Sequence, residues 1–92
     1  MSVVIIGGNE CMERRYMDIC KQYGCKARVY CKLCSDMGKR IGNPDLLILF
    51  THTVSHKMVK NALSNIPEET TVVRSHTSSA ASLQNILSAN VG

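Results

Sequence analysis

The chain of 92 residues has no tryptophan, only one phenylalanine and three tyrosines. With so few aromatic rings it lacks the basic stripe with interleaved aromatic side chains that is typical of nucleic-acid-binding domains. Eleven Lys and Arg residues against seven Asp and Glu residues give a net charge of +4, which is a mild bias toward anions. The sequence therefore argues against a nucleic-acid interface.

Long hydrophobic runs are also missing. The longest apolar run, residues 46–50, is far too short to span a bilayer, and residues 3–6 are too short for the core of a signal peptide. The five cysteines are an odd number in a chain without an export signal. They indicate reduced thiols, metal ligands or redox groups instead of a disulfide framework. We expect a cytoplasmic protein that does not enter a membrane.

Four short apolar runs recur along the chain, at residues 3–6, 27–31, 46–50 and 71–74. Three of them are nearly continuous in Val, Ile, Leu or Phe, which is typical of strands buried on both faces of a parallel sheet. Four strand–helix units with right-handed crossovers predict one Rossmann-like α/β domain over residues 1–92, a flavodoxin-like three-layer sandwich with strand order 2-1-3-4. Edge strand four has few charges that would prevent pairing, so we expect a homodimer through it.

The segments between the apolar runs have helical periodicity. In the first of them Asn9 is the expected N-cap and Gly24 the expected stop. The other helices are predicted at residues 35–41, 54–65 and 79–89.

Sulfur and imidazole groups gather where ligands bind in such a sheet, beyond the C-terminal ends of its strands. Cys11 follows the first strand, Cys31 and Cys34 follow the second, and His52 follows the third. The C-x-x-C spacing of Cys31 and Cys34 lets two thiolates bind one metal, and Cys11 and His52 are the expected further ligands. The leading hypothesis is a small non-catalytic binding or sensory module with zinc or an iron–sulfur cluster. The alternative is that these are ordinary reduced thiols.

Two other uses of the cysteines fit the sequence less well. A dithiol redox pair usually opens a long helix with Pro or an aromatic residue between the thiols, whereas here Lys32 and Leu33 stand between them. Cys34 and Arg40 have the spacing of the cysteine phosphatase loop, but only Gly38 supplies the glycines that this loop needs. We therefore assign no catalytic residue.

A second group of residues favours an anionic ligand. Hydroxyl and free amide groups at helix N-termini bind phosphate or carboxylate, and a Gly-Gly turn lets a ligand approach the backbone. The alternative function is thus a regulatory domain for a small phosphate, carboxylate or nucleotide-like ligand, although helix capping explains any single one of these Ser or Thr residues better. The same histidines are also candidate haem ligands. The residues of this anion rim are Gly7, Gly8, Asn9, Ser55, His56, Ser75, His76, Thr77, Ser78 and Ser79.

The sequence resembles a family of small proteins from anaerobic Firmicutes, the domain of unknown function 2325. The resemblance covers nearly the whole chain and rests on the segments VVIIGG at 3–8, SHKMV at 55–59 and VVRSHTSS at 72–79. It implies a small Rossmann-like fold and supports the anion rim around His56 and His76, but it implies no activity. Family members often have His in place of Asn9 and lack the three cysteines of the proposed metal site. The resemblance thus implies that the cysteines are an addition of this protein or accidental, while an anaerobic source favours iron–sulfur over zinc.

Overall fold

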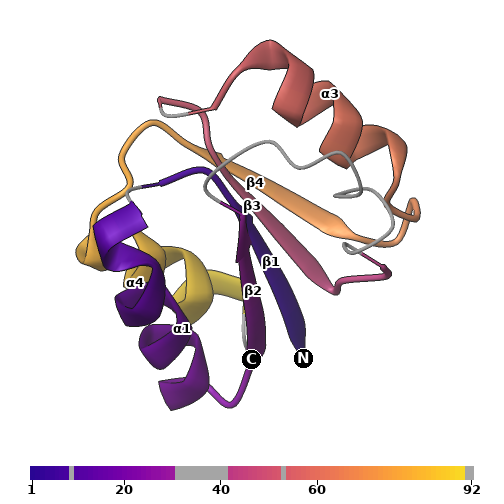
Figure 1. Ribbon diagram of the computed structural model, residues 1–92. Coiled ribbons are helices and arrows are strands. Elements are labelled where there is room, and N and C mark those ends of the chain that lie inside the picture. The colour runs from indigo at the N-terminus through magenta and orange to yellow at the C-terminus, as the bar shows by residue number, and fades with distance from the viewer. Residues whose placement is uncertain (9, 31–41, 53, 91–92) are drawn as a thin grey trace.

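The fold is an α/β sandwich around a four-stranded parallel sheet, seen in a computed structural model that describes residues 1–8, 10–30, 42–52 and 54–90 (Figure 1). The strands lie in the order β2-β1-β3-β4. Their bounds are β1 Ser2–Ile6, β2 Lys26–Tyr30, β3 Leu46–Phe50 and β4 Thr71–Ser75. The predicted fold class and strand order are confirmed, and the strand bounds differ from the prediction by at most one residue among the described positions.

The helices cover both faces of the sheet. Helices α1 (Glu13–Gln22) and α4 (Ala80–Asn90) lie on one face, and α3 (His56–Ser64) lies on the other (Figure 1). From the central pair β1 and β3, the chain crosses to β2 in one direction and to β4 in the other. Right-handed crossovers in opposite directions place α1 and α3 on opposite faces. The helix predicted at residues 35–41 lies outside the described residues.

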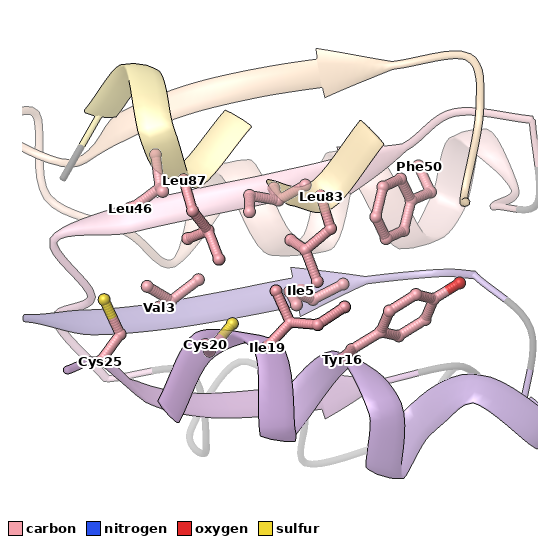
Figure 2. Packing of buried hydrophobic residues seen from close by; sticks show 11 residues of the cluster. Val3, Ile5, Tyr16, Ile19, Cys20, Cys25, Leu46, Phe50, Leu83 and Leu87 are labelled. Atoms are coloured by element: carbon pink, nitrogen blue, oxygen red, sulfur yellow. The ribbon is translucent and has the colours of Figure 1, made fainter. Parts of the chain in front are cut away.

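Two apolar clusters, one on each face, form the core. Figure 2 shows the cluster under α1 and α4, where Ile5 of β1 and Phe50 of β3 meet Tyr16, Leu83 and their neighbours. The strand residues that alternate in sequence with those of this cluster point to the other face of the sheet. There Leu47 of β3 packs against α3. The five residues of β3 are fully buried because both faces of this strand are covered, which explains its uninterrupted apolar sequence.

The ends of α1 are formed in different ways. Asn9, the predicted N-cap, lies outside the described residues; a 3-10 turn, Glu10–Met12, precedes the helix, and Met12 takes the N-cap position without a capping hydrogen bond from its side chain. The predicted stop at Gly24 is confirmed. Gly24 has a φ of +73°, and its N–H donates to the carbonyl of Lys21 at 2.9 Å, which ends the helix.

In the described part of the chain, no helix is both long enough and apolar enough to cross a membrane.

Candidate functional site

A hollow of about 290 Å³ opens at the C-terminal ends of β3 and β4, on the face that α3 covers. We call it the α3 hollow. Its lining residues are Thr51, Val54, His56, Val59 and Arg74. The two valines give it apolar walls, while the exposed residues His56 and Arg74 add side chains that carry nitrogen donors. The arrangement suits a ligand that is part apolar and part anionic.

The strand register explains why Arg74 belongs to this hollow. In the parallel pairing of β3 with β4, Arg74 stands beside Leu49, whose side chain packs in the cluster under α3. Neighbouring residues in paired strands point to the same face, so Arg74 also points toward α3, whereas Val73 packs on the opposite face. The sequence analysis placed Arg74 at the end of the fourth apolar run and in the segment that resembles the family, but predicted no ligand contact for it. The signal that would have found it is a lone cation at the C-terminal end of an apolar strand.

Helix α3 begins at the hollow. Ser55 is its N-cap, and the Ser55 side chain accepts a hydrogen bond from the N–H of Met58 at 3.3 Å. The first N–H groups of a helix have no partner within the helix, and the helix dipole makes this end electropositive. The start of α3 therefore adds to the positive potential at the hollow, next to His56.

Charges of opposite sign are separated on this side of the molecule. Helix α3 carries Lys57 and Lys60 and has no acidic residue. The nearest carboxylates along β3 and β4, those of Asp45, Glu68 and Glu69, precede these strands and therefore lie at the opposite end of the sheet. An anion in the hollow is therefore attracted by the nearby positive charges, and no carboxylate from these segments competes with it.

The hydroxyl groups between β4 and α4 are engaged in local hydrogen bonds. Ser75 Oγ donates to the carbonyl of Thr77 at 2.9 Å and accepts from the Thr77 N–H at 3.3 Å. Ser79 caps α4, since its Oγ accepts from the N–H of Ser82 at 3.2 Å, and Thr77 Oγ1 also contacts Ser82 Oγ. These bonds fix the shape of the loop. A direct role of Ser75, Thr77, Ser78 and Ser79 in ligand binding stays a prediction.

Thr51 connects this loop to the α3 hollow. Its backbone N–H and its hydroxyl both donate to the carbonyl of Ser75, at 2.9 and 3.2 Å. The same hydroxyl lies 3.4 Å from Nδ1 of the exposed His76. Thr51 therefore lies between the two histidines: it lines the α3 hollow together with His56, and its hydroxyl contacts His76.

The Gly-Gly turn after β1 is explained by the core. Gly7 is buried, and its N–H donates to the carbonyl of Tyr30 at 2.8 Å. Gly8 has a φ of +90°, and a Cβ atom there would lie 2.8 Å from Cε2 of Tyr16 and 3.2 Å from Cδ2 of Phe50. Gly8 is needed for this close approach of the two rings, and Gly7 has a positive φ of +92°, which favours glycine. A contact with a ligand stays a prediction for them, and Asn9 lies outside the described residues.

The predicted module with a cysteine-based metal site is wrong. Among the described residues, no group of three or more His, Cys, Asp or Glu side chains is placed to hold a metal ion. Cys11 and His52 are both exposed, but Cys11 lies on the connection that leaves β1 toward α1, and His52 on the one that leaves β3 toward α3. The chain thus carries them toward opposite faces of the sheet. The other two proposed ligands, Cys31 and Cys34, lie outside the described residues.

The remaining cysteines belong to the core. Cys20 and Cys25 are buried in the cluster under α1 and α4 (Figure 2). Burial, and to a smaller degree the charge of Cys25, raises the pKa of Cys20 to about 11. Cys20 therefore keeps its proton at neutral pH and is a poor metal ligand.

The other proposed uses of the rim are not tested by the geometry. The phosphatase-like pair Cys34 and Arg40 lies outside the described residues. Haem ligation by histidine stays a prediction; His52, His56 and His76 are exposed.

Comparison with known proteins identifies the family but no function. No curated protein and no solved structure matches the chain. A family model described as "Uncharacterized protein conserved in bacteria (DUF2325)" matches residues 2–89, nearly the whole chain. The match confirms the resemblance to domain of unknown function 2325 and a family found in bacteria, while the narrower distribution in anaerobic Firmicutes stays a prediction. The chain belongs to this bacterial family.

Proposed function

We propose that this domain is a regulatory module that binds a small anionic ligand in the α3 hollow. The observation that carries the proposal is the position of Arg74, an exposed cation that lines a hollow walled by Val54 and Val59. Guanidinium groups bind phosphate and carboxylate through two parallel hydrogen bonds, which gives both affinity and orientation. The valine walls favour a ligand with an apolar part beside its anionic group, such as a nucleotide.

The proposal also assigns a place to the histidines. His56 lines the hollow at the electropositive start of α3, and His76 reaches the same rim through its contact with Thr51. Each imidazole can donate a hydrogen bond to an anion in its neutral form, and each adds positive charge when protonated.

The experiment is calorimetric titration of the folded protein with AMP, with adenosine as the neutral counterpart. The phosphate is the only difference between the two ligands, so the proposal expects AMP to bind more tightly than adenosine. Loss of one charge-assisted hydrogen-bonded contact costs about 1.5–3 kcal/mol, so Arg74→Gln should weaken AMP binding by about 10- to 100-fold.

Arg14→Gln is the matched control. Arg14 is exposed on α1, on the opposite face of the sheet, and the substitution makes the same change of side chain and net charge. AMP affinity should be unchanged in this variant. Equal losses in both variants would mean that only overall charge matters, and equal affinity for AMP and adenosine would remove the support for an anion site.

The proposal includes a cytoplasmic protein that forms a homodimer through β4. Buried Cys20 and Cys25 carry thiols, which is usual for proteins of a reducing compartment. The dimer is argued below from the hydrogen-bonding groups of β4.

A further inference from the structure

Two residues at the outer edge of β4 have backbone groups that face away from β3, and no strand in the described part of the chain pairs with them. On the inner edge of β4, the N–H of Thr71 donates to the carbonyl of Asp45 at 3.1 Å, and the carbonyl of Ser75 accepts from the N–H of Thr51 at 2.9 Å. Backbone groups of successive strand residues alternate in direction, so every second residue from Thr71 faces β3. The N–H and C=O groups of Val72 and Arg74 therefore face outward, and among the described strands β4 pairs only with β3.

The side chains of β4 do little to protect this edge. Val72 is 36% exposed, one of few large apolar side chains at the surface of the described residues. Val73 is half-buried against the cluster under α1 and α4, and Thr71 is β-branched and exposed. Natural edge strands usually carry Lys, Pro or a bulge to discourage pairing, and β4 has Arg74 as its single charge.

From this edge we infer that a second copy of the chain pairs antiparallel with β4 about Val73, and that the pairing brings the partner's Arg74 into the anion site of the first copy. A two-fold axis at Val73 sets Thr71 opposite the partner's Ser75 and Val72 opposite the partner's Arg74. This is the register in which all five residues of β4 have a counterpart. Each Val72–Arg74 pair exchanges both of its outward backbone hydrogen bonds, which gives partners to groups that no described strand of the single chain pairs.

The pairing joins the two α3 hollows. Val72 and Arg74 point to the face of α3 in each copy, and residues opposite one another in an antiparallel pair share a face. Arg74 and the partner subunit's Arg74 then stand in the diagonal relation of such a pair, at a distance of roughly 7–8 Å. That distance separates the two Cα atoms, so the long arginine side chains on them can reach a common region, where their like charges repel until an anion lies between them.

The ligand class follows from this pair of cations, and this step rests on the proposed function. A ligand with several negative charges, such as a nucleoside polyphosphate or inorganic polyphosphate, reaches both arginines across the two-fold axis. Such a ligand binds the dimer more tightly than the monomer and, by linkage, strengthens the dimer. The site is complete only when the partner supplies its Arg74.

Sedimentation velocity over a range of concentrations tests the register. In Val72→Lys the new ammonium group faces Arg74 of the partner subunit, and two such like-charge pairs should raise the dimer dissociation constant about tenfold. Adding Arg74→Glu to Val72→Lys replaces both repulsions by Lys–Glu pairs and should restore the dimer. Thr71→Lys is the control, because this position faces Ser75 of the partner subunit and should leave the dimer unchanged.

A second measurement separates this inference from the proposed function. Inorganic pyrophosphate should lower the dissociation constant of the wild-type dimer and have no such effect on the Val72→Lys/Arg74→Glu protein. A monomer at all concentrations, an open-ended assembly, or a dimer indifferent to Val72→Lys would overturn the pairing even if AMP binds to the single chain. A dimer of the expected register that pyrophosphate does not tighten would overturn the shared anion site.

Discussion

Gly8 lies directly against the ring of Tyr16. A Cβ atom on Gly8 would be 2.8 Å from Cε2 and 3.0 Å from the hydroxyl oxygen of Tyr16, and 3.2 Å from Cδ2 of Phe50. The turn after β1 thus closes over a fully buried aromatic pair, whose ring centroids are 5.4 Å apart. This contact links the rim of the sheet to the core beneath it.

Gly8→Ala should be strongly destabilising. The substitution adds a methyl group where no space exists and requires an L residue at a φ of +90°, and these two costs together amount to about 3 kcal/mol of unfolding free energy. Gly24→Ala is the control, because Gly24 also has a positive φ, +73°, but a Cβ there would meet no atom within 4 Å. It should cost only the backbone strain, about 1 kcal/mol. Urea denaturation measures both values, and equal losses would contradict the steric explanation.

Tyr16→Phe should destabilise the fold without disturbing its packing. The Tyr16 hydroxyl donates to the carbonyl of Ser78 at 2.5 Å and so ties α1 to the loop before α4. Removing the hydroxyl leaves a partly buried carbonyl without this donor, at a cost of about 1–2 kcal/mol. Tyr23→Phe is the control: the Tyr23 hydroxyl is exposed, and its contact with the carbonyl of Gln84 is long, at 3.5 Å. We expect a loss below about 0.5 kcal/mol there, and a similar loss for both tyrosines would argue against the tie.

The sequence was sufficient to predict the sheet. The continuous apolar run 46–50 is β3, one of the two central strands, and Gly24 ends α1 as its position indicated. Both features depend on local rules, the burial of a parallel strand on two faces and the positive φ of a glycine stop. The four strand–helix units then left few possible orders, and the observed one is the order expected for a small flavodoxin-like sheet.

The site was harder to predict, because it depends on which face each residue reaches. Spacing alone placed Cys11 and His52 on one rim, but it does not show that the chain turns toward opposite faces after β1 and β3. Arg74 was missed because the sequence alone does not show which face of the sheet its side chain reaches. Its role depends on the register with Leu49, a contact between distant parts of the chain. The loop hydroxyls, such as Ser79, satisfy neighbouring backbone groups, which a sequence pattern cannot distinguish from ligand binding.

The buried thiol of Cys20 should make stability fall at alkaline pH. Burial, with a smaller effect of Cys25, raises the pKa of Cys20 from 9.0 to about 11. As the pH rises between these values, the unfolded chain loses the proton and the folded protein keeps it, so unfolding becomes more favourable. The full effect of such a shift is roughly 2–3 kcal/mol.

The comparison of wild type with Cys20→Ala isolates this effect, because the two proteins differ only at this residue. The loss of packing makes the variant less stable at about pH 8. Its deficit should shrink as the pH approaches about 10.5, since only the wild type carries the thiol. Urea denaturation at several pH values gives the difference, and a deficit that stays constant would show that the thiol titrates alike in both states.

Ser55 allows helix capping to be separated from anion binding. Ser55→Ala removes the acceptor of the Met58 N–H and should cost about 1 kcal/mol of stability while leaving Arg74 and the α3 hollow able to bind AMP. Ser55→Asp keeps a good N-cap and adds a favourable charge at the start of α3, so stability should be equal to or above that of the wild type.

The same aspartate stands between Val54 and His56, two residues of the α3 hollow, and its carboxylate competes with an anionic ligand for the positive potential there. AMP binding should therefore fall about tenfold in Ser55→Asp and little in Ser55→Ala, the reverse of their order in stability. Thermal unfolding ranks the two variants by stability, and calorimetric titration ranks them by AMP affinity. Ser64→Ala, at the far end of α3, is the control. If binding followed stability in these variants, the hollow would act only as part of the fold; if the two orders are reversed, the start of α3 contributes charge to an anion site.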